Sequence, residues 1–282
     1  MCKNNKHAFL IMLSGEPVGF LDHIKMYDDE DIDFFIHVDM SCSNSYVETV
    51  RNFSLEKSHV TFLNQIRGSW GDFSLVNIEL LLLKKATQRD NYQYFHLMSG
   101  SDYLLKNPEE IKSFFKEYYP SNFVNFEREC ELDKKRPLFK LLALKLPIQS
   151  KKLKYGISSR ELQLRIFLSR KSIVRNKNYG LKFRKGSQWI SITDKAARYI
   201  LESSEIIENT FNGTLIPDEL FVQSILYSSS QFRNTISGNN LRYIDWERGL
   251  PYVFKSSDLK ELKKASDNWF IARKYSFKNV TN

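Results

Sequence analysis

Short apolar runs rich in β-branched and aromatic residues alternate along this chain with longer amphipathic stretches. Apolar runs of roughly four to eight residues are typical of buried strands, whereas apolar residues spaced three and four apart are typical of helices. The alternation predicts an α/β fold, with a central mixed, mainly parallel sheet flanked by helices. The predicted strands cover residues 7–13, 32–38, 60–63, 92–97, 123–126, 189–192 and 241–246.

Capping residues between these runs mark where helices begin. Asn107 and Pro108, followed by two glutamates, suit the N-cap and the first turn of a helix. An earlier helix begins at Asp72 and places Glu79 among leucines and a valine on one face. Further helices are predicted from Thr193-Asp194 towards Leu201 and from Ser257-Asp258 towards Trp269.

Length and composition fit one globular domain. The 282 residues are 42% hydrophobic and 14% aromatic, which is enough for a full core, and no internal repeat or Pro/Gly/Ser-rich linker interrupts them. We therefore predict a single domain over residues 1–282. The apolar run at 7–13 is much too short to span a bilayer, so we interpret it as a first buried strand and not as a signal peptide or anchor.

Cysteine usage favours a reducing cytoplasm. The three cysteines, Cys2, Cys42 and Cys130, are odd in number and widely separated, which indicates neither a disulfide framework nor a metal cluster. The histidines show no ligand spacing, and the chain contains no glycine-rich loop of the dinucleotide or P-loop type.

Positive charge is concentrated in residues 134–185. This segment holds 17 lysines and arginines and a single acidic residue, Glu161, while the formal net charge of the whole chain is +9. Because apolar runs interleave with the charges, the segment could contact an anionic membrane surface or attract an anionic acceptor. A solvated basic face over ordinary core residues is an equal alternative. No recognised nucleic-acid motif accompanies the charge, so we expect no nucleic-acid partner.

The tripeptide Pro217-Asp218-Glu219 carries the strongest local signal for chemistry. Proline suits the first position of a helix and acidic residues favour its positive end, so we predict that a helix begins here. A carboxylate held at such an end is a plausible general base for an alcohol. The alternative is a helix start with no further role.

Six short motifs, taken in order, resemble the core-2/I-branching family of β-1,6-N-acetylglucosaminyltransferases, which also includes the peptide O-xylosyltransferases. The motifs are IHVD at 36–39, GSWG at 68–71, FHLMSGSD at 95–102, GSQW at 186–189, PDE at 217–219 and FIARK at 270–274. The resemblance extends from about His7 to Tyr275. It implies a bacterial-type member of the family with the GT-A fold, a UDP-sugar donor and a metal-independent mechanism.

On the donor side, the resemblance implies roles for four residues. Asp39 ends a predicted strand, where an open α/β sheet usually places its ligand, and the family aspartate lies near the uracil of the donor. A polar strand end facing solvent is the alternative. The closing FIARK motif implies that Lys274, with Arg273 beside it, binds the diphosphate, and Arg242 is a candidate second cation. By composition alone, Arg273-Lys274 is a common surface pair.

Asp102 stands where most GT-A transferases carry an aspartate pair for a divalent metal, and here the pair is reduced to one residue. A lone carboxylate does not exclude a metal, since such sites use one or two carboxylates plus donor phosphates. The resemblance, however, implies that cations of the protein replace the metal, so we expect no metal cofactor and an Asp102 that faces the sugar or the acceptor. A turn-stabilising aspartate is the alternative.

The remaining candidates lie on the acceptor side. Gln188 stands where the xylosyltransferases carry the aspartate that is implied to be their base, and an amide cannot take that proton at neutral pH. This departure moves the base to Glu219, as in the branching enzymes, with Asp218 beside it on the substrate side. Trp189 either stacks on a sugar or fills the core.

These features predict an inverting glycosyltransferase that moves a sugar, first of all N-acetylglucosamine from its UDP donor, onto a hydroxyl of a glycan or lipid-linked glycan. We expect a role in bacterial surface polysaccharide synthesis, in the cytoplasm and peripherally at the inner membrane face. UDP-xylose, UDP-galactose and UDP-glucose are alternative donors. A non-catalytic carbohydrate-binding relative of the same fold is the alternative from another class.

Overall fold

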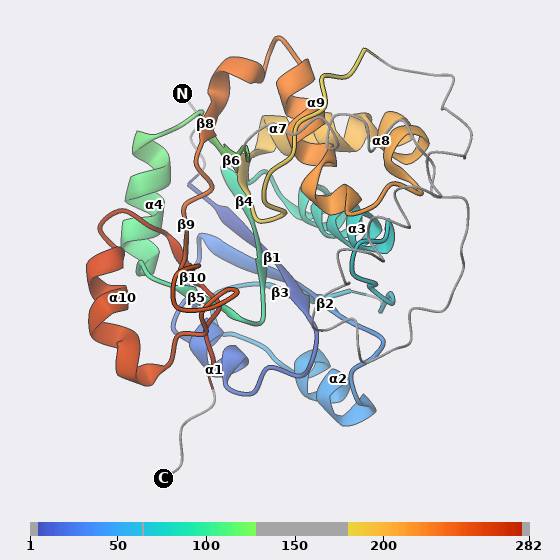
Figure 1. Ribbon diagram of the computed structural model, residues 1–282. Helices are drawn as coiled ribbons and strands as arrows, with labels where there is room; N and C mark the ends of the chain where they lie inside the picture. Colours follow the sequence, from blue (N-terminus) through green and yellow to red (C-terminus); the bar gives the residue numbers. More distant parts are fainter. Residues whose placement is uncertain (1–4, 64, 128–179, 278–282) are drawn as a thin grey trace.

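The computed structural model describes residues 5–63, 65–127 and 180–277. Its centre is a seven-stranded sheet in the order β3-β2-β1-β4-β7-β6-β8 (Figure 1). Strands β1 to β4 are parallel to their neighbours among themselves, β7 is antiparallel to β4 and β6, and β6 is parallel to β8. The expected mixed, mainly parallel sheet is therefore confirmed. The strands are β1 (His7–Leu13), β2 (Ile32–Val38), β3 (Val60–Phe62), β4 (Tyr94–Ser99), β6 (Asn122–Asn125), β7 (Ser191–Thr193) and β8 (Ile236–Gly238).

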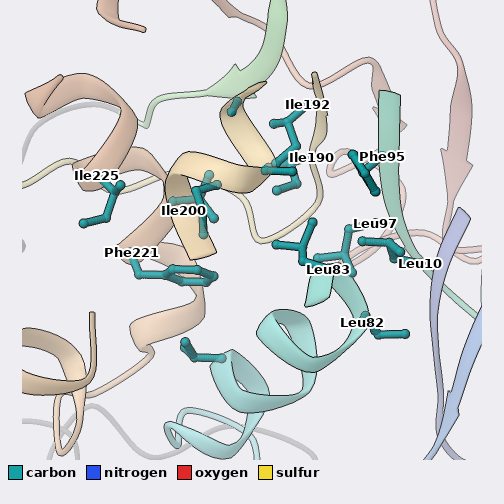
Figure 2. Close-up of a cluster of buried hydrophobic side chains, with 14 of the residues drawn as sticks. Leu10, Leu82, Leu83, Phe95, Leu97, Ile190, Ile192, Ile200, Phe221 and Ile225 are labelled. Carbon is teal, nitrogen blue, oxygen red and sulfur yellow. The ribbon is translucent and has the colours of Figure 1, made fainter. Parts of the chain in front are cut away.

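Helices flank the sheet and close one apolar core on each face. Helices α3, α7, α8 and α9 pack with residues of β1 and β4 on one face, while α1, α2 and α4 close the core on the other. Figure 2 shows Leu83, Ile200 and Phe221 gathered in the same cluster as Leu97 of β4. The bounds are α1 (Phe20–Lys25), α2 (Asn44–Arg51), α3 (Ser74–Arg89), α4 (Pro108–Glu117), α7 (Asp194–Glu202), α8 (Ser204–Phe211) and α9 (Phe221–Ser228).

The strand order creates a switch point beside β1. From β1 the chain moves outward to β2 and β3, and it then places β4 on the other side of β1. Ligands of open α/β sheets bind outside the carboxyl ends of the strands at such a point. Asp39 follows β2 and Asp102 lies just after β4, so both residues belong to this edge. Because β7 is antiparallel to β4, the residues 186–190 that precede β7 reach the same edge.

A second, three-stranded sheet brings the carboxyl-terminal motif to this edge. Its order is β5-β10-β9, with β5 (Asp102–Leu104), β9 (Arg242–Ile244) and β10 (Ile271–Arg273). β10 is antiparallel to β5, and their register places Arg273 opposite Asp102. The strand expected at 241–246 is thus present in a shorter form. The sequence did not indicate β5 or β10, because three residues are too few to show an alternating pattern.

Capping chemistry located several helix starts correctly. The Asn107 side chain accepts a hydrogen bond from the backbone of Glu110, and the Glu110 side chain accepts one from the backbone of Asn107, which completes a capping box for α4. Thr193 caps α7 through the backbone N–H of Ala196. The lysine-rich helix α10 (Leu259–Ala265) follows a 3-10 turn, η5 (Ser256–Asp258), and a further 3-10 turn, η4 (Arg233–Thr235), precedes β8.

The helix start expected at Pro217 is wrong in one respect. Pro217–Glu219 form a separate 3-10 turn, η3, and α9 begins only at Phe221. The backbone carbonyl of Glu219 accepts a hydrogen bond from Gly186 N at 2.9 Å, and Leu220 leaves the helical region with a φ of −125°. The carboxylates of Asp218 and Glu219 therefore lie before the helix and not on its first turn.

Most of the basic segment expected at 134–185 lies outside the described residues. The structure describes only its last residues, from 180 to 185, so contact of the segment with a membrane or an acceptor stays a prediction. Among the helices that the structure does describe, none combines the length and the apolar character needed to cross a bilayer.

Candidate active site

A buried ion pair between Asp102 and Arg273 lies at the carboxyl end of β4. Asp102 is fully buried, and its Oδ2 accepts a hydrogen bond from the backbone N–H of Ser99 at 2.7 Å. Its Oδ1 accepts from Nη1 of Arg273, which also donates to the hydroxyl of Ser99 at 2.7 Å. Both carboxylate oxygens of Asp102 are thus used to hold the loop after β4 and the guanidinium of Arg273.

The guanidinium of Arg273 lies over the ring of Trp189, with 3.9 Å between the carbon Cζ and the ring centroid. This is a close cation–π contact, and it restricts the guanidinium to one plane. Within the described part of the chain, Nε and Nη2 of Arg273 form no hydrogen bond. Those donors are therefore available to an anion that approaches the edge of the sheet.

Lys274 adds a second cation beside Arg273. Its side chain is half-buried, and burial followed by repulsion from Arg273 lowers the pKa of its ammonium, while Asp102 opposes the shift. The ammonium makes neither a hydrogen bond nor an ion pair with any residue that the structure describes. A bound anion would relieve the repulsion between the two cations, so this pair is suited to a diphosphate.

Arg242 lies behind the ion pair and not at the open edge. It is 3% exposed, and its Nη2 donates to the backbone carbonyls of Leu97 and Ile190 at 2.9 and 2.8 Å. Its Nη1 donates to the Ser191 hydroxyl at 3.1 Å and to the carbonyl of Asn240. These bonds join β4, the segment before β7 and the small sheet. Direct contact between Arg242 and a donor, as the sequence suggested, would require some of them to break.

Asp39 is buried and organises the loop that follows β3. Its Oδ2 accepts from the backbone N–H of Gly68 at 2.6 Å, and its Oδ1 accepts from the backbone N–H of Ser41 at 2.8 Å. The side chain thus ties the loop with the GSWG motif to the end of β2. Each oxygen keeps a second lone pair that is able to accept a further hydrogen bond. The expected contact between Asp39 and uracil therefore stays a prediction.

Glu219 lies on the other side of the site, with a side chain that is 32% exposed. Its Oε2 is 3.4 Å from the ammonium of Lys185, which also pairs with Glu127. A neighbouring ammonium favours the charged form of a carboxylate, and a general base needs that form. The partial exposure leaves room for an acceptor hydroxyl to approach.

Asp218 has a different environment from its neighbour. It is 5% exposed, and its Oδ1 is buried without a hydrogen-bond partner in the described structure. Burial, followed by repulsion from Glu219, raises the pKa of Asp218 from 3.8 to about 7. The two adjacent carboxyl groups therefore differ in accessibility, and Glu219 is the better placed base.

The segment 186–189 connects the two halves of the site. Gly186 donates its N–H to the carbonyl of Glu219, while Trp189, three residues later, packs under Arg273. A Cβ at position 186 would lie 2.0 Å from the carbonyl oxygen of Asn125, so only glycine fits there. Gln188 thus belongs to a short segment that contacts the backbone of Glu219 at Gly186 and the guanidinium of Arg273 at Trp189.

Gln188 contacts a buried carboxylate that the sequence did not nominate. Its Nε2 donates to Oε1 of Glu79 on α3 at 2.8 Å, and Glu79 is only 2% exposed. Burial, followed by repulsion from Asp218, raises the pKa of Glu79 well above its ordinary range. The sequence signal that would have identified Glu79 was an acidic residue on the predicted apolar face of this helix.

Lys185 is the second site residue that sequence reasoning missed as an individual. It belonged only to the charged segment 134–185, in which nothing distinguished it from other lysines.

In the described part of the structure, no cluster of three or more His, Cys, Asp or Glu side chains is arranged to hold a metal ion.

Comparison with known proteins identifies the family of this chain. The model of the Core-2/I-Branching enzyme family matches residues 7–271. Xylosyltransferase 1 of Rattus norvegicus is 22% identical over 95% of this chain and 33% of its own length, and that of Homo sapiens is 22% identical over 95% and 28%. The chain therefore belongs to the Core-2/I-Branching enzyme family, and it spans about a third of the length of these curated relatives.

Two solved structures show weaker likeness. S. aureus TarS 1-349 in complex with UDP has a TM-score of 0.42 at 13% identity, covering 93% of this chain and 64% of that chain. Mouse xyloside xylosyltransferase 1 in its apo form has a TM-score of 0.39 at 12% identity, covering 98% of both chains. The family assignment rests on the sequence match and not on these scores.

Substitution of Asp218 by Asn should stabilise the protein at alkaline pH. A carboxyl whose pKa is raised on folding stabilises the fold fully below pH 3.8, and that contribution is lost as the pH rises to about 7. Relative to wild type, Asp218→Asn should therefore gain up to about 1.4 kcal/mol per pH unit between pH 4 and 7 and stay level above it. Urea denaturation across this range measures the difference.

The exposed Asp267→Asn on the loop after α10 serves as the matched control for the loss of one carboxyl group. A difference for Asp218→Asn that stays constant with pH would show that Asp218 is ionised throughout this range.

Proposed function

We propose that the protein is an inverting glycosyltransferase that moves a sugar from a UDP-sugar donor onto a hydroxyl of a glycan acceptor. The observation that supports the proposal is a partly exposed carboxylate, Glu219, and a cation pair, Arg273 and Lys274, on segments that the same short stretch of chain contacts. The segment 186–189 connects them through Gly186 and Trp189. Membership of the Core-2/I-Branching enzyme family supports the same reaction.

In the proposed reaction, Glu219 takes the proton of the acceptor hydroxyl as that oxygen attacks the anomeric carbon. Attack comes from the face opposite the diphosphate, so the bond to UDP breaks as the new bond forms and the configuration inverts. Negative charge then grows on the departing diphosphate. Arg273 and Lys274 stabilise that charge, and their effect is larger in the transition state than in the bound donor.

Metal independence is part of the proposal, and the position of Asp102 supports it. Asp102 is the residue that would ligate a metal in the usual GT-A arrangement, yet Arg273 and the Ser99 backbone occupy its two oxygens. Asp102 is also fully buried, so a divalent ion would have to reach it past the guanidinium of Arg273. We propose instead that Arg273 and Lys274 supply the positive charge.

For the donor sugar, we propose N-acetylglucosamine first. UDP-xylose is a second candidate, because the curated relatives are named xylosyltransferase 1. Gln188 weighs against a xylosyltransferase mechanism with a base at this position, because an amide does not accept a proton at neutral pH. The acceptor, in this proposal, is a lipid-linked precursor of a bacterial surface polysaccharide, used by an enzyme at the inner membrane face. Turnover with a panel of UDP-sugars tests the donor.

Glu219→Gln should abolish transfer and leave donor binding nearly intact. Loss of a general base costs about 10²- to 10⁴-fold in rate, and the amide preserves the shape of the side chain. Steady-state kinetics beside UDP titration measures both effects. Glu205→Gln, on the exposed face of α8, is the control and should match wild type. More than half of wild-type turnover in Glu219→Gln would mean that another group is the base.

Lys274→Ala should weaken UDP binding and also lower kcat. A hydrogen bond to a charged group contributes enough that its loss should weaken UDP binding roughly 10- to 100-fold, and kcat falls because the diphosphate gains charge in the transition state. Isothermal titration with UDP and steady-state kinetics check the two effects. The exposed Lys264→Ala on α10 should change neither. Unchanged UDP affinity in Lys274→Ala would leave this lysine without a role at the diphosphate.

Transfer activity should survive an excess of EDTA. The physical reason is that Arg273 and Lys274 supply the positive charge in place of a metal ion, and a chelator does not remove side chains. The measurement compares initial rates before and after chelation and after gel filtration. Activity that disappears with EDTA and returns with manganese or magnesium would overturn the metal-free mechanism.

A further inference from the structure

The side-chain amide of Gln188 is held by two hydrogen-bond acceptors. Its Nε2 donates to Oε1 of Glu79 at 2.8 Å and lies 3.8 Å from the sulfur of Met12. The thioether sulfur has no proton to donate, so it favours the nitrogen of Gln188 over the oxygen as its neighbour. The nitrogen of Gln188 accordingly faces α3 and β1, and Oε1 of Glu79 can accept this bond even when the other carboxyl oxygen carries a proton.

This orientation turns the amide oxygen of Gln188 away from α3. The oxygen forms no hydrogen bond with any described residue and is not sealed from solvent. Its neighbours along the chain are Gly186, bonded to the backbone of Glu219, and Trp189, which packs under Arg273. An acceptor-only oxygen thus belongs to the short segment that contacts the backbone of Glu219 at one end and the guanidinium of Arg273 at the other.

A carboxylate at position 188 would be poorly tolerated beside Glu79. Glu79 is already buried and already repelled by Asp218, as the direction of its pKa shows. A further carboxyl group here would share a desolvated environment with two carboxyl groups whose pKa values are already raised, so its charged form would be disfavoured as well. The amide avoids this charge, but an amide presents an acceptor only if its nitrogen is held elsewhere. Glu79 supplies that restraint.

We propose that Glu79 is a positioning residue, which makes Gln188 a neutral hydrogen-bond acceptor for a hydroxyl of the sugar being transferred. The inference rests on the proposed function, since the donor sugar must lie between the diphosphate and the base. It assigns Glu79 no contact with substrate. Its effect passes through the Gln188 amide, whose oxygen meets the hydroxyl only while the nitrogen is bonded to Glu79.

The first test compares UDP with the UDP-sugar that wild type binds, both titrated into the full chain. Glu79→Leu removes the acceptor on α3, so the amide rotates freely and UDP-sugar affinity falls roughly tenfold, while UDP affinity stays within about twofold. Glu79→Gln is the matched control, because its amide oxygen still accepts from Nε2 and should retain wild-type affinity for both ligands. Gln188→Leu should reproduce the loss seen in Glu79→Leu, which keeps the inference testable where that variant does not fold.

The second test is rescue by a carboxylate. A carboxylate accepts through either oxygen, so its orientation does not have to be fixed by Glu79. Gln188→Glu combined with Glu79→Leu should therefore restore UDP-sugar affinity to within about threefold of wild type. The same Gln188→Glu beside wild-type Glu79 should weaken it at pH 8, because two carboxylates then face each other. A packing role for Glu79 predicts no rescue.

Different results would contradict the glycosyltransferase activity and the positioning role of Glu79. Wild-type protein that binds neither UDP nor any UDP-sugar overturns the proposed glycosyltransferase and this inference with it. Wild-type binding with a Glu79→Leu variant that loses UDP and UDP-sugar affinity equally, or loses neither, overturns only the role of Glu79.

Discussion

The ion pair between Asp102 and Arg273 is the contact on which the architecture of the site depends. It joins β5 to β10 and thereby attaches the carboxyl-terminal sheet to the end of β4. Removing either partner would leave the other charge buried and unpaired, which is far more costly than losing an exposed salt bridge. Because the pair also fixes the plane of Arg273 over Trp189, one interaction sets both the fold of the edge and the direction of its free donors.

The charges of the site are separated by function. Cations gather around the end of β10, where Arg273 and Lys274 repel each other and so favour a bound anion. Carboxylates gather around η3, where Asp218 and Glu79 are desolvated and Glu219 alone reaches partial exposure beside Lys185. A reaction that moves a proton to one side and a diphosphate to the other needs this separation, since each product charge then meets the opposite sign.

Supporting residues account for much of the order around these groups. Arg242 uses its guanidinium to bind backbone carbonyls of β4 and of the segment before β7. Asp39 uses both carboxylate oxygens for the backbone of two loops. Charged side chains at the edge of this sheet thus bind the backbone, and residue type alone does not separate that use from contact with a ligand.

The sequence by itself determined the strands with strong local signals, the helix starts at Asn107 and Thr193, and the family. Buried strands such as β1 and β2 were located to the residue, because a continuous apolar run bounded by polar residues is a local property. The motifs PDE and FIARK also identified Glu219, Arg273 and Lys274 as candidate site residues, because a short motif is recognised from consecutive residues alone.

Only the tertiary structure decided which of the charged groups meet. Arg273 pairs with Asp102 across 171 residues, and Gln188 bonds to Glu79 across 109. The start of α9 was misplaced for the same reason, because a backbone N–H from Gly186 takes the carbonyl of Glu219. Hydrogen-bond partners, burial and the resulting charge states depend on contacts between distant segments, and no pattern within a short window of sequence contains them.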